Sequence, residues 1–236
     1  MQWRSASASH VGLHRQLNED AVLERPEIGL WAVADGMGGH AKGDVASQTV
    51  MAVLQRMKPA PDLCTFVEFT EHQITQANDY LLRLARRGPE TIGTTVIALL
   101  THAAHCAFLW AGDSRLYRWR RGWLQQLSTD HSKVAEYVKL GLITASEANH
   151  HPDGNLITRA VGAAADLRLE CNLEALEAGD RFLLCSDGLN KHVEFRSIAN
   201  LLGEGPIEQV PGKLIDATLK AGASDNVTVC TVEIIG

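Results

Sequence analysis

Acidic residues recur beside apolar runs in this sequence. In three places a small residue is followed by Asp and then by Gly or Ser, and in two further places an acidic residue precedes a short apolar run. The segments are Ala34-Asp35-Gly36, Gly112-Asp113-Ser114, Ser186-Asp187-Gly188, Ser224-Asp225-Asn226 and Glu19-Asp20. Because Asp-Gly is a common turn dipeptide, any one of these carboxylates alone would be an ordinary turn residue. Their repetition favours strand ends that carry carboxylates to a common place.

Carboxylates gathered in this way would need a positive partner. Two like unit charges 4 Å apart repel by about 4 kcal/mol at an effective dielectric constant of 20. The candidate groups are hard oxygen donors, and no His or Cys stands at matching positions. Such donors suit Mg²⁺ or Mn²⁺ better than zinc or copper. The sequence therefore predicts a centre for divalent ions if the strand ends converge.

The composition limits the class of protein. The 236 residues carry 22 Lys and Arg against 28 Asp and Glu, which lacks the basic excess typical of nucleic-acid binders. Five cysteines form no CxxC pair, which disfavours a disulfide framework or a zinc knuckle. The first residues are polar and small, and the longest apolar stretch, residues 96–110, is interrupted by Thr101, His102 and His105. We therefore expect a cytoplasmic protein without a membrane span.

Hydrophobic periodicity predicts helices and strands in separate blocks. Helices are expected over residues 45–57, 62–87, 194–202 and 207–221. Strands are expected over residues 30–34, 94–100, 105–111, 116–120, 123–127, 167–173, 181–185 and 227–234. Thr144 and Glu147 have the spacing of a capping box, which predicts a short helix. This arrangement favours an α+β protein with antiparallel sheets, and we expect a single domain over residues 1–236.

The carboxylates also belong to longer motifs that follow one another along the chain. These are Arg15-Gln-Leu-Asn-Glu19-Asp20, Asp35-Gly-Met-Gly-Gly39, Gly93-Thr-Thr95, Gly112-Asp-Ser-Arg115, Thr129-Asp-His-Ser132, Thr158-Arg-Ala-Val-Gly162, Ser186-Asp-Gly-Leu189 and Ser224-Asp-Asn-Val-Thr228. One such motif is weak evidence, but the ordered set covers nearly the whole chain. It resembles the metal-dependent protein phosphatases, the PPM or type 2C family, and the compact length is similar to that of stand-alone bacterial members.

The resemblance implies a fold and a metal centre. The fold would be a sandwich of two antiparallel β-sheets flanked by α-helices on both outer faces. A centre of two Mn²⁺ or Mg²⁺ ions would lie at one end of the sandwich. By motif position, Asp35 would bridge the two ions and the Gly36 carbonyl would bind one of them. Asp187 and Asp225 would bind the other ion.

Further residues take roles from the same resemblance. Glu19 and Asp20 would hold metal-bound waters, and Asp113 would help to hold a third, weaker ion. Arg15 would grip the substrate phosphate, because the planar guanidinium can clamp two phosphate oxygens at once. Residues 131–158 correspond to a flap beside the site, and their polar character suits contact with a protein substrate.

These residues predict hydrolysis by direct attack of water. Two ions about 3.5–4 Å apart can hold a bridging hydroxide and stabilise an in-line displacement at phosphorus. No Cys-x₅-Arg loop is present, so we expect no phosphocysteine intermediate. The expected activity is that of a protein serine/threonine phosphatase acting on phosphoserine and phosphothreonine.

Two alternatives stay open at this stage. One is a pseudophosphatase that binds a phosphoprotein without turnover, although Asp35, Asp187 and Asp225 are all present. The other is a hydrolase of small phosphate esters. Under the main hypothesis the partners are a phosphorylated protein, with a bacterial Ser/Thr kinase or its targets expected, and neither nucleic acid nor membrane. We expect a monomer.

Overall fold

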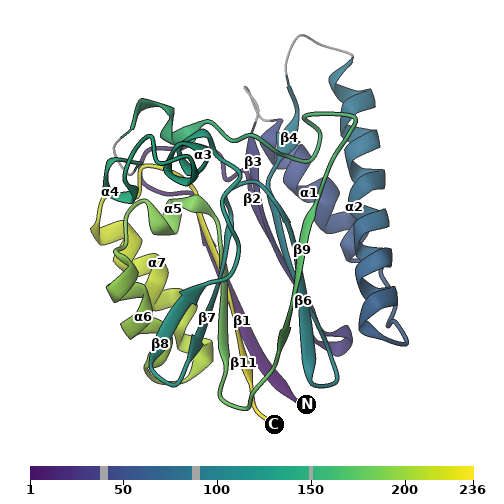
Figure 1. Ribbon diagram of the computed structural model, residues 1–236, viewed down its shortest axis with the longest axis vertical. Helices are drawn as coiled ribbons and strands as arrows, with labels where there is room; N and C mark the ends of the chain where they lie inside the picture. Colours follow the sequence, from purple (N-terminus) through teal and green to yellow (C-terminus); the bar gives the residue numbers. More distant parts are fainter. Residues whose placement is uncertain (38–41, 87–90, 149–150) are drawn as a thin grey trace.

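Two antiparallel β-sheets lie face to face in the computed structural model, which describes residues 1–37, 42–86, 91–148 and 151–236 (Figure 1). The first sheet has the strand order β1 (Trp3–His10), β11 (Val227–Ile234), β10 (Arg181–Cys185), β7 (Arg115–Arg120), β8 (Trp123–Gln126). The second has the order β2 (Asp20–Arg25), β3 (Leu30–Met37), β5 (Val96–His102), β6 (His105–Ala111), β9 (Glu170–Ala175). The short strand β4 (Gly93–Thr94) pairs with β3.

Helices cover the outer face of each sheet. Helices α1 (Gly43–Leu54) and α2 (Leu63–Ala85) pack on the second sheet, and α6 (Phe195–Gly203) and α7 (Val210–Lys220) pack on the first (Figure 1). The short helix α5 (Asp187–Asn190) follows β10 directly. The sandwich of two sheets with helices on both outer faces is therefore confirmed.

Strand alternation sorts the apolar side chains into layers. On β3, Trp31 and Val33 face the first sheet, whereas Leu30, Ala32 and Ala34 face α1 and α2. Successive side chains of a strand point to opposite faces, so one strand serves both cores. The layer between the sheets is closed by large side chains from both sides, including those at positions 108, 110 and 182. The two sheets are consequently held at a fixed separation, which fixes the relative positions of their ends.

Most elements expected from the sequence are present, with shifted ends. The helices expected over 45–57 and 62–87 are α1 and α2, the strand expected over 167–173 is β9, and residues 207–209 form a 3₁₀ turn (η3) before α7. Leu167 and Leu169, within the expected bounds, lie before the observed strand and pack against the helical side of the second sheet. The last two residues of the Asp35-Gly-Met-Gly-Gly39 motif and the last residue of the helix expected over 62–87 lie outside the described residues.

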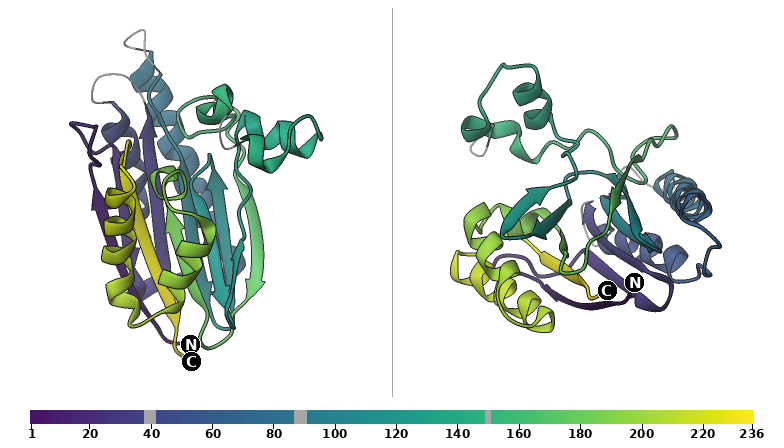
Figure 2. Two further views of the ribbon diagram at one scale, coloured as in Figure 1. Left: turned by 90° about the vertical axis from the view of Figure 1, so that its left-hand side faces the viewer. Right: turned by 60° about the horizontal axis from the view of Figure 1, so that its bottom comes forward.

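The flap, residues 131–158, projects from the sandwich (Figure 2). It carries α3 (Lys133–Lys139), α4 (Ala145–Ala148) and the 3₁₀ turn η2 (Pro152–Asn155). The capping box at α4 is confirmed, since Thr144 N donates to Glu147 Oε2 at 2.7 Å and Glu147 N donates to Thr144 Oγ1 at 3.3 Å. None of the helices in the described residues is both long enough and apolar enough to cross a membrane.

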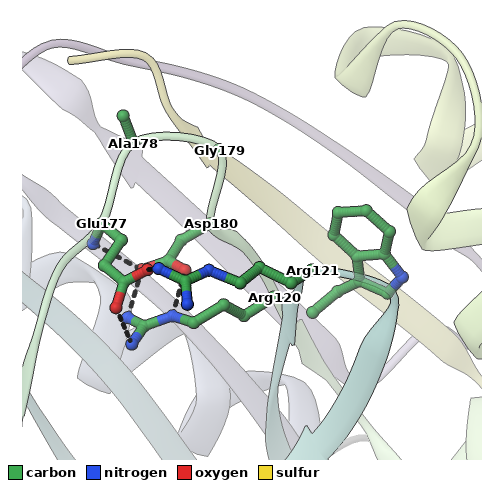
Figure 3. A pocket seen from close by; sticks show the side chains of 7 residues that line it. Arg120, Arg121, Glu177, Ala178, Gly179 and Asp180 are labelled. Carbon is green, nitrogen blue, oxygen red and sulfur yellow. Dashed lines mark hydrogen bonds and ion pairs between the residues drawn. The ribbon is translucent and has the colours of Figure 1, made fainter.

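A hollow of about 280 Å³ lies between the β7–β8 hairpin and the turn before β10 (Figure 3). Arg120 donates to both carboxylate oxygens of Asp180 and to Glu177, and Arg121 also pairs with Glu177. These two arginines therefore connect the β7–β8 turn with the turn that precedes β10. The guanidinium groups of Arg120 and Arg121 are thus engaged by acidic side chains.

Candidate metal centre

Asp20 and Asp35 face each other at one end of the second sheet. They are Cα partners in the β2–β3 ladder, at the start of β2 and near the end of β3. Two threonines fix the backbone of Asp35: its amide donates to Thr95 Oγ1 at 2.9 Å, and Thr94 Oγ1 donates to its carbonyl at 2.9 Å. A cross-strand pair of acids is destabilising by itself, so this position is not explained by strand stability.

Asp20 also joins this sheet end to the first sheet. Ser186 Oγ donates to Asp20 Oδ2 at 2.8 Å and accepts a hydrogen bond from Thr228 N at 2.9 Å. The other oxygen of Asp20, Oδ1, is buried and has no hydrogen-bond partner among the described residues. Burial, more than the hydrogen bonds can offset, raises the pKa of Asp20 to about 7. One carboxylate oxygen is thus available for a further partner.

Burial and the charges of four other acidic groups raise the pKa of Asp35. Its pKa is raised well above the usual range, first by burial and then by the charges of Asp20, Asp187, Asp113 and Asp225. The pKa of Asp113, in the β6–β7 turn, is raised to about 7, first by burial and next by the charge of Asp187. Repulsion strong enough to raise a pKa requires that the carboxylates lie close together with little water between them. The ends of β3, β6 and β10 and the start of β11 therefore bring these carboxyl groups to one end of the sandwich.

Two of the carboxylates are paired with basic side chains. Arg15 Nε lies 2.9 Å from Asp225 Oδ1, and Arg15 Nη2 donates to Asp225 Oδ2 at 3.0 Å, which makes the pair bidentate. Lys191 forms an ion pair with Asp187, four residues earlier. Among the described residues, no group of three or more Asp, Glu, His or Cys side chains is placed to hold a metal ion as it stands. Arg15 and Lys191 would therefore have to release Asp225 and Asp187 before these carboxylates could bind a metal ion.

Backbone crowding explains the glycines beside two of the aspartates. A Cβ on Gly36 would lie 2.1 Å from Gly43 O, and a Cβ on Gly188 would lie 1.9 Å from Asn226 O. No larger residue fits at either position without moving backbone. Gly188 thereby lets the start of α5, with Asp187, lie directly against the start of β11.

The loop between β1 and β2, which carries Arg15, is held by a residue to which the sequence analysis gives no role. Asn226 Oδ1 accepts a hydrogen bond from Glu19 N at 2.8 Å, and Asn226 Nδ2 donates to Val11 O at 2.9 Å and to Leu17 O at 3.0 Å. Glu19 Oε1 accepts from Gly43 N at 3.1 Å. Burial raises the pKa of Glu19, with the backbone bond to Gly43 opposing it. The position of Asn226 directly after Asp225 is the one signal that could have indicated this role.

The base of the flap is fastened beside Asp113. The imidazole Nδ1 of His131 accepts from Gly112 N at 3.1 Å, and the His131 amide donates to Gly112 O at 2.9 Å. Thr158 N donates to His131 O at 2.7 Å, so both ends of the flap meet at this residue. His131 also stacks on Trp110, with the ring centroids 5.9 Å apart. The flap is therefore fixed to the same sheet end as the acidic groups.

The chemistry of these donors fits hard divalent cations. All the gathered groups bind through oxygen, which is the ligand type of Mg²⁺ and Mn²⁺. Burial and the charges of neighbouring carboxylates raise the pKa values of Asp20, Asp35 and Asp113, and a cation among them would reverse the second effect. The buried, unpartnered oxygen of Asp20 is a second sign that the cluster lacks positive charge.

The fold belongs to the class of α+β sandwiches in which two antiparallel sheets are covered by helices, here with acidic groups gathered at one end. The sequence profile of the family described as Protein phosphatase 2C matches residues 6–206. This chain belongs to that family. Among curated relatives, the serine/threonine protein phosphatase PstP of Mycobacterium tuberculosis is 36% identical over 237 residues, which cover 98% of this chain and 45% of PstP. The chain thus spans about half the length of that relative.

Solved structures give the same assignment. PppA, described as a key regulatory component of T6SS in Pseudomonas aeruginosa, has 41% sequence identity and a TM-score of 0.92 over 99% of this chain and 98% of its own. The catalytic domain of PstP in complex with two manganese ions has 34% identity and a TM-score of 0.90 over 99% of each chain. The likeness to the PstP catalytic domain extends over nearly all of both chains.

Proposed function

We propose that this chain is a metal-dependent protein serine/threonine phosphatase. The observation that carries the proposal is the position of half-buried Asp35 among Asp20, Asp113, Asp187 and Asp225, whose charges raise its pKa. Membership of the Protein phosphatase 2C family and the named phosphatase relatives support the same activity. The substrates would be phosphoserine and phosphothreonine side chains of proteins.

Two divalent ions would be held by four residues of the cluster. Asp35 and the carbonyl of Gly36 would bind one ion, with Asp35 shared, and Asp187 and Asp225 would bind the other. When bound, the ions would supply a Lewis-acid centre that activates water and stabilises negative charge on a phosphoryl group. The likeness to the manganese complex of PstP favours Mn²⁺ as the first ion to test.

Three acidic residues would support that pair of ions. Glu19 and Asp20 would orient water molecules around it, and the unpartnered Oδ1 of Asp20 suits such a contact. Asp113 would contribute to a third, weaker site. Its raised pKa, caused by burial and then by Asp187, indicates an environment in which added positive charge is favourable.

Arg15 would bind the substrate phosphate. Its guanidinium already holds a carboxylate, that of Asp225, in the bidentate geometry that also fits a phosphate. Because Arg15 is about half exposed, its side chain can turn from Asp225 to an incoming anion. Binding of a metal ion by Asp225 and binding of phosphate by Arg15 would then favour each other.

The cellular setting is proposed from the relatives. A phosphoprotein, such as a bacterial Ser/Thr kinase or one of its targets, would be the substrate, and the likeness to PppA makes type VI secretion signalling the first pathway to examine. We treat residues 1–236 as one catalytic domain, since the first strand, β1, pairs along its length with the last, β11. A monomeric, cytoplasmic protein stays a prediction from the sequence.

The decisive experiment compares substrates and metal ions. The values of kcat/KM should be measured on a phosphothreonine peptide and on an aryl phosphate, with Mn²⁺, with Mg²⁺ and with chelator. We expect turnover of the phosphopeptide that depends on the metal ion and is abolished by chelator. Phosphopeptide binding without turnover in any metal would indicate a pseudophosphatase. A strong preference for one small ester would indicate a small-molecule hydrolase, and turnover that resists chelator would contradict the proposal.

A further inference from the structure

Lys191 connects the acidic cluster with the flap. It follows α5, one helical turn after Asp187, and its ammonium group is shared between two partners. Nζ forms an ion pair with Asp187 Oδ2 and donates to Asn155 Oδ1 at 2.7 Å. Asn155 is the last residue of η2, near the returning end of the flap. In Figure 1, α5 and the flap helices lie at the same end of the sandwich.

From these contacts we propose that Lys191 is a positioning residue that holds Asp187 in competition with a divalent ion and, through Asn155, fastens the flap. This inference rests on the proposed function, because it takes Asp187 as a ligand. It adds a residue to which the phosphatase motifs of the sequence assign no role. One ammonium group would thus link metal occupancy with the position of the flap.

The surroundings of Lys191 favour a charged ammonium group. Burial alone would lower its pKa, but the charges of Asp187, then Asp113 and Asp225, raise the pKa above its ordinary value. Its side chain is about one-third exposed. Lys191 therefore interacts with three of the proposed ligands at once and partly neutralises the cluster.

Competition follows from the sign of the charges. A divalent ion bound to Asp187 would repel the ammonium group held by the same carboxylate, so each weakens the other. The binding free energies are coupled reciprocally: a change that frees Asp187 from Lys191 must strengthen metal binding. Removal of the hydrogen bond between Lys191 and Asn155 should also strengthen metal binding, because that hydrogen bond helps to hold the Lys191 ammonium group at Asp187.

The flap end would respond to Lys191 because, within the described residues, the other hydrogen bonds of residues 151–158 run to the flap itself, as from Tyr137 Oη to Asp153 Oδ2 at 3.2 Å. Lys133 N donates to Leu156 O at 2.8 Å, and Ser132 forms an isolated bridge with Ile157. Leu140 and Leu142, farther out in the flap, are exposed. Chymotryptic cleavage at the flap leucines therefore reports how firmly the segment is held.

The test measures Mn²⁺ affinity by calorimetry and flap cleavage by chymotrypsin in chelator. Lys191→Met should lower the Kd for Mn²⁺ at least fivefold and raise the cleavage rate at least threefold. Lys191→Arg, which keeps the charge, should leave the Kd within about twofold of wild type. Asn155→Ala should raise the cleavage rate and lower the Kd by less than Lys191→Met does. The matched control is Lys133→Met, which removes a flap ammonium that contacts Glu136, and should change neither value.

The outcomes separate the two hypotheses. If wild type binds Mn²⁺ and turns over phosphopeptide but folded Lys191→Met keeps the wild-type Kd, only the role of Lys191 is wrong. If wild type neither binds Mn²⁺ nor turns over substrate, the proposed function and this inference both fail. Should Lys191→Met not fold, as judged by circular dichroism, Asn155→Ala decides: an unchanged cleavage rate and Kd would overturn the coupling.

Discussion

Asp35 is half-buried, and the charges that act on it include four carboxylates. A carboxylate with little access to water is normally paired with a cation or protonated. The backbone of Asp35 is nevertheless fixed by Thr94 and Thr95. A residue kept in such a costly position has a role other than folding stability, and binding of divalent cations is the role that the donor atoms fit.

Replacement of Asp35 separates function from stability. Asp35→Asn keeps the size of the side chain but removes the charge, so we expect kcat/KM on a phosphopeptide to fall at least 100-fold. Because repulsion with Asp20 and Asp187 also falls, Tm in chelator should rise by a few degrees. Activity assays and thermal denaturation on one preparation check both. Retention of more than a few per cent of the wild-type rate would contradict the assignment of Asp35.

The raised pKa values also predict a pH dependence of stability in chelator. Asp20 titrates near 7 in the folded chain, against an ordinary value of 3.8. Between these values the unfolded chain loses its proton first, so ionisation favours unfolding and stability falls as pH rises from about 4 to 7. One pKa unit corresponds to about 1.4 kcal/mol, and about 1 kcal/mol shifts Tm by roughly 2–4 °C in a chain of this size.

The measurement compares wild type with Asp20→Asn. The difference in Tm between the two proteins should change by several degrees over that pH range, with the variant gaining relative to wild type as pH rises. Asp153→Asn, in the flap, serves as a control carboxyl away from the cluster. A difference that is independent of pH would show that Asp20 ionises normally in the folded chain.

At the residue scale the sequence indicated acids better than their partners. The Asp-Gly and Asp-Ser repeats predict converging carboxylates because each stands beside an apolar run. The contact of Ser186 with Asp20 has no such signal, because it depends on the packing of β10 against a strand of the other sheet. The i,i+4 spacing of Asp187 and Lys191 indicates an ion pair only once residues 187–191 are known to be helical.

At the scale of elements, the approach of α5 to β11 positions Asp187. This approach requires glycine at position 188, since a Cβ there would lie 1.9 Å from Asn226 O. The same backbone segment carries Asp225 and, through Asn226, the loop with Arg15. Displacement of α5 by one ångström would therefore disturb metal ligands and the phosphate-binding residue together.

Gly188→Ala tests this contact. We expect a fall in Tm of several degrees and at least a tenfold loss of Mn²⁺ affinity, because the added methyl group forces the two backbones apart. Gly212→Ala in α7 is the matched control, as a Cβ there meets nothing within 4 Å. That control should keep metal affinity and gain slightly in stability, since Ala favours helix over Gly. Unchanged metal binding in folded Gly188→Ala would show that the close approach is not needed.

Strands were predictable where their apolar pattern is continuous and were missed where it is not. Residues 96–102 and 105–111 are rich in buried apolar side chains and form β5 and β6 close to their expected bounds. The segment Trp3–His10 alternates Ser and Ala, and no strand was expected there. It becomes β1 because β11 supplies a complete ladder and Glu24 accepts hydrogen bonds from Ser5 and Ser7. Tertiary partners decide such a strand, since its own residues have little preference.

At the scale of the whole molecule, the acidic cluster draws its residues from both sheets. Asp35 belongs to the second sheet, whereas Asp187 and Asp225 flank strands of the first. The layer of large apolar side chains holds the sheets together along their length. At the site end the carboxylates repel one another, and bound cations would replace that repulsion by a shared attraction.

Metal binding should therefore stabilise the entire sandwich. A ligand that binds only the folded state at 100 times its Kd adds about 2.7 kcal/mol, which corresponds to a rise in Tm of about 5–10 °C in a chain of this size. We expect this rise with Mn²⁺, its reversal by chelator, and its loss in Asp35→Asn. Differential scanning calorimetry at several Mn²⁺ concentrations checks the dependence, and Asp153→Asn should behave as wild type. A Tm that does not respond to saturating Mn²⁺, in protein shown by calorimetric titration to bind the ion, would mean that the unfolded chain binds the ion as well as the folded chain does, which contradicts a site assembled from both sheets.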